Sequence, residues 1–432
     1  MNIDQRASPG AVDSLMPTGR RIKIWFTVSA LACVVRLVAA VATKSLLNPK
    51  LYEYDEIAQS LLTGDGFTYA HLGIKYYSYC APLPVWISAG SYWLTSTTAL
   101  VMLAQIAAAS ALAAIVAATS ERIFGGWIAA ASAGVLVALH PGLIAYSATK
   151  AHVLPFDALF FTLALLQSFR LAERCTIRRA LEFGLILGIG ALCRPTIVIF
   201  GPITLAWLLA IAPRRSRTLV FRNLVIAGLL TGCIIAPWTI RCSLLHHRFV
   251  FLLTTDAEDF WVGNNPYATG HAYITPGHAI IAAQPADELK DLAQQPNETA
   301  QADWFARRSH AFIRAHPGGF LRLTFLKFFH FWWYAPQTGA EYPGKWFYLY
   351  MIYYVAVLIL AAFGIWRVVR AGPPATHLVL LMGFFLFGLS ALQSLYYVEG
   401  RHRWAIEPML LAVSGGGLAA LVERIRRLTV IK

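Results

Sequence analysis

The sequence predicts an all-α polytopic membrane protein, and two observations carry this prediction. Of the 432 residues, 57% are hydrophobic and the mean hydropathy is +0.56, whereas a soluble domain is about 45–50% apolar. Apolar runs of about 18 or more residues, the length that a helix needs to cross a bilayer, recur along the chain. We expect a bundle of about ten to eleven transmembrane helices with two long outer loops that contain short interfacial helices.

Ten segments qualify as candidate spans, with boundaries accurate to a few residues. One of them, residues 179–193, is short for a helix that crosses the bilayer. The candidate spans are 23–43, 97–119, 124–142, 153–171, 179–193, 196–212, 221–239, 346–366, 376–396 and 404–422.

The net charge of +14 indicates topology and not a nucleic-acid partner. Ten spans place both termini on one side, and the basic clusters lie in the tails and loops of that side. Loops rich in lysine and arginine stay in the cytoplasm, so both termini are expected to be cytoplasmic. The clusters are RR at 20–21, ERCTIRR at 173–179, PRRSR at 213–217 and ERIRR at 423–427.

A single domain is expected between two short cytoplasmic tails. Residues 1–22 are predicted to be a disordered tail, 23–425 the transmembrane domain and 426–432 the second tail. The two long loops, 44–96 and 241–345, then face the periplasm or exterior, so the chemistry is expected on that side.

Residues 318–336 are apolar but carry Arg322, Lys327 and His330 along roughly one face. As an eleventh span, this segment would place the basic C-terminus outside the cell. We therefore expect an amphipathic helix in the outer membrane interface.

The stretch YEYDEIAQSLLTGDGF at 52–67 predicts a short helix that ends at Gly64. Asp55 then lies near the helix start, and Glu56 points about a quarter-turn away. An acid in the first turn is stabilised by the helix dipole by about 0.3–1 kcal/mol, so a purely structural role for Asp55 is one explanation. The apolar stripe of this helix consists of Tyr54, Ile57, Leu61 and Leu62.

The outer loops have features suited to a lipid-linked sugar phosphate. The chain contains no Walker loop, no HExxH and no GxSxG. A lipid-linked sugar phosphate needs an apolar groove for its tail, cations for its phosphate and a carboxylate that deprotonates the acceptor hydroxyl. Displacement at the anomeric carbon would invert its configuration.

Candidate phosphate-binding cations lie on the same side. Arg401, His402 and Arg403 in EGRHRWAIEP at 399–408 precede the last span, and ordinary lipid headgroups are an alternative ligand for them. Arg194 lies near an outer helix end, where a snorkelling arginine or a salt bridge to Asp157 is the alternative.

Other polar residues of the outer side are candidates for substrate binding. Lys75 and Tyr76 in the first loop would contact the donor or acceptor, or be solvated. Asp157 would bind an ion, place the acceptor or cap a helix. Asn264 and Asn265 lie in the turn-forming GNNPYATG, and loop structure alone would also explain them.

Four stretches together resemble the GT-C superfamily of membrane glycosyltransferases, and within it the dolichyl-phosphate-mannose protein mannosyltransferase-like group, glycosyltransferase family 39. They are the 52–67 stretch, PWTIR at 237–241 with FWVGNNPYATG at 260–270, FIRAHPGGFLRLTFLKFFHFWW at 312–333, and RHRWAIEP at 401–408. The match covers about residues 20–425.

The resemblance implies an inverting glycosyltransferase in which Asp55 is the catalytic base and Glu56 its paired acid. The donor would be a polyprenyl-phosphate sugar, and the acceptor a glycolipid, polysaccharide or protein. No cofactor is expected, and a divalent-cation requirement stays open. The protein would lie in a bacterial inner membrane. The sequence departs from the family pattern in the first loop. Family members often carry a basic residue before the proline-rich start of the next segment, whereas no basic residue stands between Lys75 and Pro82 here.

Two other classes of function are alternatives. A transporter or flippase of lipid-linked sugars would use charges inside the membrane, and Arg36 and Glu182 are the only clear charges in the middle of a predicted span. A structural subunit of an envelope complex would need no chemistry at Asp55.

Overall fold

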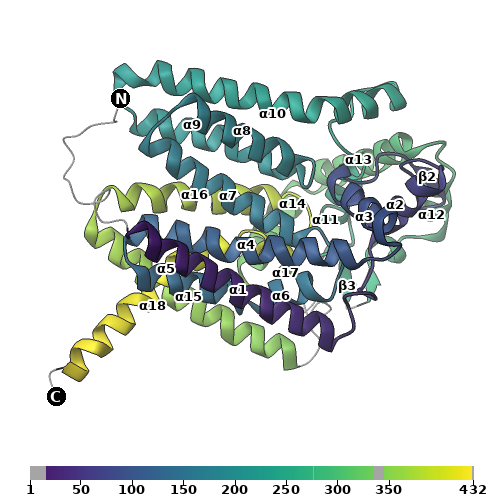
Figure 1. The fold of residues 1–432 in the computed structure, drawn as a ribbon. Helices are drawn as coiled ribbons and strands as arrows, with labels where there is room; N and C mark the ends of the chain where they lie inside the picture. Colours follow the sequence, from purple (N-terminus) through teal and green to yellow (C-terminus); the bar gives the residue numbers. More distant parts are fainter. Residues whose placement is uncertain (1–15, 276, 335–344, 431–432) are drawn as a thin grey trace.

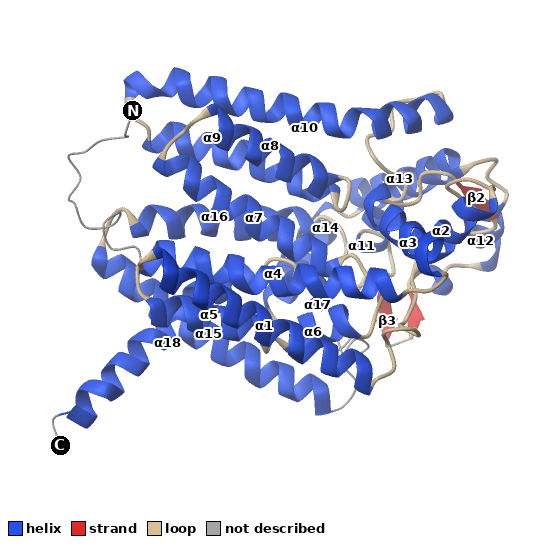
Figure 2. Ribbon diagram, in the orientation of Figure 1, coloured by secondary structure: helices blue, strands red, loops and turns tan. Residues whose placement is uncertain are grey.

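The computed structural model describes residues 16–275, 277–334 and 345–430. Long helices lie side by side, and short helices with two small hairpins form an outer lobe at one end (Figure 1). The strands of the described chain all lie in this lobe (Figure 2). The start of helix α1 and the end of helix α18 lie at the opposite end of the bundle.

Seven helices of the described chain are long and apolar enough to cross a membrane, and a bent helix pair would make an eighth span. The predicted all-α membrane fold is confirmed, but the expected ten to eleven spans are not. The seven are α1 (Thr18–Ala42), α4 (Ala99–Phe124), α7 (Leu154–Glu173), α10 (Arg217–His246), α15 (Lys345–Ala371), α16 (Ala375–Gln393) and α18 (Glu407–Val430).

The difference in the number of spans arises at the shortest of the predicted segments. Residues 179–193 correspond to α8 (Ile177–Ala191), which at 1.5 Å per residue is well short of the ~30 Å hydrocarbon core. Residues 196–212 correspond to the 3₁₀ turn η1 (Pro195–Ile199) and α9 (Phe200–Ile211).

The bent pair replaces the predicted span at 124–142. Helices α5 (Trp127–Ala138) and α6 (Pro141–Ala148) meet at 52°, because Pro141 has no N–H to continue the helix. The break leaves carbonyl groups at the end of α5 without helical partners. The buried Arg36 donates to the carbonyls of Ala138 (3.1 Å) and Val137 (3.2 Å), so this intramembrane charge stabilises the break.

The outer lobe is built from both long loops. The first contributes α2 (Glu53–Thr63), the hairpin of β1 (Tyr69–His71) and β2 (Ile74–Tyr76), and α3 (Pro82–Thr95). The second contributes α11 (Asp256–Gly263), the hairpin of β3 (Tyr273–Thr275) and β4 (His278–Ala279), the turn η3 (Ile281–Ala283), α12 (Ala286–Ala293), α13 (Glu298–Ala315) and α14 (Pro317–Trp332). The turn η2 (Arg214–Ser216) precedes α10, and α17 (Gly400–Trp404) precedes α18.

Two sequence predictions for this lobe concern its helices. Helix α2 ends as expected, with Gly64 in the left-handed region at φ +93°. Helix α14 covers most of the predicted 318–336 segment, whose last two residues lie outside the described chain. It is not among the helices long enough to span. Its interfacial position stays a prediction.

A buried carboxylate fastens the two loops together. Glu298 accepts hydrogen bonds from the backbone N–H groups of Tyr77 (2.9 Å) and Ser78 (3.3 Å) and lies 2.6 Å from Nε2 of His246 at the end of α10. The residues that follow Ser78 are thereby held next to the second loop, where they form part of the cavity described below.

Candidate functional site

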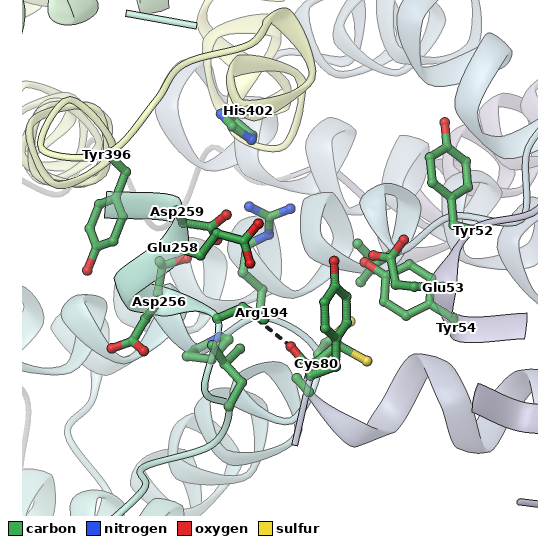
Figure 3. A pocket seen from close by; sticks show the side chains of 18 of the residues that line it. Tyr52, Glu53, Tyr54, Cys80, Arg194, Asp256, Glu258, Asp259, Tyr396 and His402 are labelled. Atoms are coloured by element: carbon green, nitrogen blue, oxygen red, sulfur yellow. Dashed lines mark hydrogen bonds between the residues drawn. The ribbon is translucent and has the colours of Figure 1, made fainter. Parts of the chain in front are cut away.

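A cavity of about 500 Å³ opens between the outer lobe and the helix bundle. Its walls come from the start of α2, residues 79–81, residues 193–196, helix α11 and helix α17 (Figure 3). This volume is within the range of sites that bind small ligands. Tyrosine side chains form much of the lining, namely Tyr52, Tyr54, Tyr79, Tyr396 and Tyr397.

The acid that α2 presents to the cavity is Glu53. It lies in the first helical turn and is partly exposed, and its carboxylate makes no ion pair or hydrogen bond with any described residue. In the view of Figure 3, Glu53 lies on one side of Arg194, and Glu258 and Asp259 of α11 lie on the other. Glu53 is therefore available to accept a proton from a group bound in the cavity.

Asp55 and Glu56 do not line the cavity. Two residues along a helix correspond to a rotation of about 200°, so Asp55 points to the side opposite Glu53. Only 1% of Asp55 is exposed, and its Oδ1 accepts a 3.4 Å hydrogen bond from the Tyr92 hydroxyl of α3. Burial raises the pKa of Asp55 to about 6, while Glu56 is exposed. Their catalytic roles stay predictions.

Two arginines line the cavity, and each is held by a carboxylate that does not. Nε of Arg194 lies 2.6 Å from Oδ2 of Asp157, so the salt bridge expected as an alternative is present. Nη2 of Arg401 lies 2.7 Å from Oε2 of Glu399. Asp157 thus contacts a cavity residue but not the cavity itself.

His402 also lines the cavity. Burial and the charge of Arg401 hold its pKa well below the usual value, so its ring is neutral. Nδ1 accepts a 3.2 Å hydrogen bond from the backbone N–H of Glu399. The proton is therefore on Nε2, which makes His402 a hydrogen-bond donor.

Arg403 does not line the cavity and is 3% exposed, and its contact with the donor phosphate stays a prediction. It donates to the Phe331 carbonyl (3.0 Å) and the Tyr350 hydroxyl, and its Nε lies 3.3 Å from Glu407. These contacts fasten α17 to α14, α15 and α18.

The first-loop candidates lie outside the cavity. The side chain of Lys75 is exposed on the β1–β2 hairpin. Tyr76 is buried and donates from its hydroxyl to Oε1 of Gln301 at 2.6 Å. Tyr76 therefore joins the hairpin to α13.

The two candidate asparagines are buried in the turn after α11. Asn264 donates to the Leu395 carbonyl (2.7 Å) and accepts from Nζ of Lys327 (2.9 Å). Asn265 donates to the Trp261 carbonyl (2.8 Å) and accepts from the Tyr267 N–H (2.8 Å). These contacts stabilise the loop, and a role of either residue in substrate binding stays a prediction.

Sequence reasoning missed the acids that do face the cavity. Glu53 lies within the quoted stretch at 52–67, and Asp256, Glu258 and Asp259 lie in the DAED run of the second loop. Burial, with a smaller contribution from Glu258, raises the pKa of Asp259 to about 8. Asp259 is thus largely protonated at neutral pH and can donate a hydrogen bond.

Comparison with known proteins finds a matching family model and solved structures with a similar fold. Residues 80–240 match the family described as dolichyl-phosphate-mannose-protein mannosyltransferase. The apo oligosaccharyltransferase of Archaeoglobus fulgidus has a TM-score of 0.56 and 13% identity, over 95% of this chain and 51% of that protein. The chain has no match among curated protein sequences.

Two further solved structures contain a polyprenyl phosphate. ArnT from Cupriavidus metallidurans, bound to undecaprenyl phosphate, has a TM-score of 0.53 and 16% identity, over 90% of this chain and 60% of that one. AglB from A. fulgidus, with an inhibitory peptide and a dolichol-phosphate, has a TM-score of 0.51 and 12% identity, over 93% and 51%. This chain therefore spans 51–60% of the length of these proteins. The predicted resemblance to GT-C glycosyltransferases is confirmed, and the fold is the GT-C fold.

Proposed function

We propose that this GT-C-type membrane protein is an inverting glycosyltransferase that moves a sugar from a polyprenyl-phosphate donor to an acceptor hydroxyl. One observation carries the proposal: the carboxylate of Glu53 and the guanidinium groups of Arg194 and Arg401 line the same cavity. A base and a phosphate-binding pair are the two groups that this reaction requires.

The residues suggest the following roles. Arg194 and Arg401 bind the donor phosphate, with Nε2–H of His402 as a further donor. Glu53 accepts the proton of the acceptor hydroxyl while that oxygen bonds to the anomeric carbon. The bond from this carbon to the phosphate oxygen breaks on the opposite face, and the leaving polyprenyl phosphate keeps the electron pair.

The position of the carboxylates favours Glu53 over Asp55 as the base. Asp55 remains the residue that the sequence resemblance nominates, and its pKa of about 6 suits proton transfer. Its side chain, however, packs against α3, outside the cavity. Substitution of each residue separates the two assignments.

The lipid nature of the donor is supported by the solved proteins with the same fold. ArnT holds undecaprenyl phosphate and AglB a dolichol-phosphate. The proposal for this chain is a polyprenyl-phosphate-linked hexose or pentose, with a glycolipid, polysaccharide or protein as acceptor. The surrounding bilayer and the exposed apolar faces of the bundle would accommodate the polyprenyl tail.

The proposed orientation places the cavity on the periplasmic or outer side of a bacterial inner membrane, with both tails in the cytoplasm. The basic clusters at the start of α1 and at the end of α18 lie at the end of the bundle away from the outer lobe (Figure 1). Such clusters favour the cytoplasmic side. Residues 23–425 would then be one functional domain.

No observation specifically favours a transporter. Arg36 is satisfied by carbonyl groups at the helix break. Glu182 of α8 pairs with Arg178 at 3.0 Å and accepts from Gln167 at 2.9 Å. Both of these mid-span charges thus have structural partners.

The test uses the purified full chain in lipid vesicles with a panel of undecaprenyl-phosphate monosaccharides and candidate acceptors. We expect release of undecaprenyl phosphate that depends on an acceptor and is lost in Arg401→Gln. Movement of intact donor across the vesicle membrane without any release would instead identify a transporter.

A further inference from the structure

Helix α17 presents neighbouring side chains to two different environments. Arg401 and His402 line the cavity, whereas Arg403 is buried among α14, α15 and α18. Because Arg403 fixes the helix, the place of Arg401 in the cavity wall does not depend on its own ion pair alone.

Glu399, the residue before this helix, contacts Arg401 from outside the cavity. Its carboxylate accepts from the backbone N–H of His402, as in a capping box, and lies 2.7 Å from Nη2 of Arg401. Glu399 is not part of the cavity lining. The guanidinium that faces the cavity is therefore partly neutralised from behind.

This arrangement matters because the reaction changes the charge of the bound phosphate. The donor is a phosphodiester with one negative charge, whereas the released phosphomonoester carries about 1.5 to 2 at neutral pH. The Coulomb energy of a ligand scales with its charge. Two unopposed arginines would therefore hold the product more tightly than the donor, and product release limits the turnover of many enzymes.

We propose that Glu399 is a specificity-determining residue that weakens the binding of the product phosphate more than that of the donor. The inference rests on the proposed function. The negative charge of Glu399 opposes the phosphate in both complexes, but it opposes a dianion about twice as strongly as a monoanion. The donor is retained and the product leaves.

Glu399→Gln isolates this effect. Glutamine has nearly the same shape and keeps one acceptor oxygen for the His402 N–H, and Arg403 still fixes the helix, so the fold of this segment is kept while the charge is removed. Two possible roles of Glu399 then predict opposite results. If Glu399 mainly orients Arg401, its replacement weakens phosphate binding. If Glu399 mainly reduces the effective charge of Arg401, its replacement strengthens phosphate binding.

The experiment measures binding of undecaprenyl phosphate and of an undecaprenyl-phosphate monosaccharide that the wild type consumes, using the full chain in nanodiscs. For Glu399→Gln we expect about five- to tenfold tighter binding of undecaprenyl phosphate and a smaller gain for the donor. Single turnover should be no slower than in the wild type, because Glu399 also opposes the charge that develops on the leaving phosphate, whereas multiple turnover should be slower. Asp303→Asn, which removes a carboxylate paired with Arg248 (2.9 Å) away from the cavity, is the matched control.

Equal gains for both ligands, or weaker binding of undecaprenyl phosphate, would overturn the role of Glu399. A wild type that neither binds undecaprenyl phosphate nor consumes any donor would overturn the proposed function itself. The two failures are therefore distinguishable.

Discussion

The Nε atom of Arg194 lies 2.6 Å from Oδ2 of Asp157, whose side chain is completely buried at the start of α7. Arg194 faces the cavity with a side chain that is 24% exposed, so the pair joins the transmembrane bundle to the site. A buried carboxylate is stable only with its partner, because an unpaired buried charge is costly.

Removal of Arg194 should therefore impair stability and donor binding, and the two effects should separate. Arg194→Gln leaves Asp157 buried without its cation, which costs roughly 3–5 kcal/mol, so the melting temperature should fall. In Arg194→Gln/Asp157→Asn the melting temperature should recover while donor binding stays weak. Thermal melting and donor binding, measured in the same lipid, check this. Recovery of donor binding in the double variant would show that Arg194 is only structural.

The stability contribution of Asp55 should depend on pH. Burial raises its pKa from 3.8 to about 6 in the folded protein, so its charged form opposes folding above pH 6. This cost is relieved as the pH falls from about 6 towards 4. Asp55→Asn should therefore be more stable than wild type at pH 8, by up to about 3 kcal/mol, with the difference shrinking below pH 6.

Melting temperatures of wild type and Asp55→Asn across this pH range check the prediction, with the exposed Glu56→Gln as control. A difference that does not vary with pH would contradict the buried position of Asp55. If Asp55→Asn keeps its donor turnover, Asp55 is not the base.

Close packing at Gly263 should control the cavity wall formed by α11. A Cβ atom at this position would clash with the carbonyl of Tyr396 and the backbone nitrogen of Tyr397 (2.8 Å). Gly263→Ala must therefore separate α11 from the tyrosines that line the cavity, and donor affinity should fall at least about tenfold. Gly90→Ala, where a Cβ would meet nothing within 4 Å, should change nothing. Wild-type donor affinity in Gly263→Ala would show that this contact is unimportant.

Much of the fold follows from sequence patterns, because long apolar segments have few alternatives in a bilayer. The segments that differ from the predicted spans are those in which the helix is interrupted or short. The bend at Pro141 depends on partners such as Arg36, which lies about a hundred residues away in the chain.

The candidate site was predicted less completely because it depends on which side of a helix meets which neighbour. The sequence shows that Glu53, Asp55 and Glu56 share one helix, but the packing of α2 against α3 decides that Asp55 is buried and Glu53 faces the cavity. Likewise, Arg401 and Arg403 are separated only by His402, and the polar groups of α14, α15 and α18 decide that Arg403 is internal.

The most direct test of the account is single-turnover consumption of an undecaprenyl-phosphate sugar by Glu53→Gln, with Asp303→Asn, which lies away from the cavity, as the control. Loss of a general base should slow the reaction about 10²- to 10⁴-fold without weakening donor binding, whereas Asp303→Asn should react at the wild-type rate. Wild-type consumption by Glu53→Gln would contradict the account.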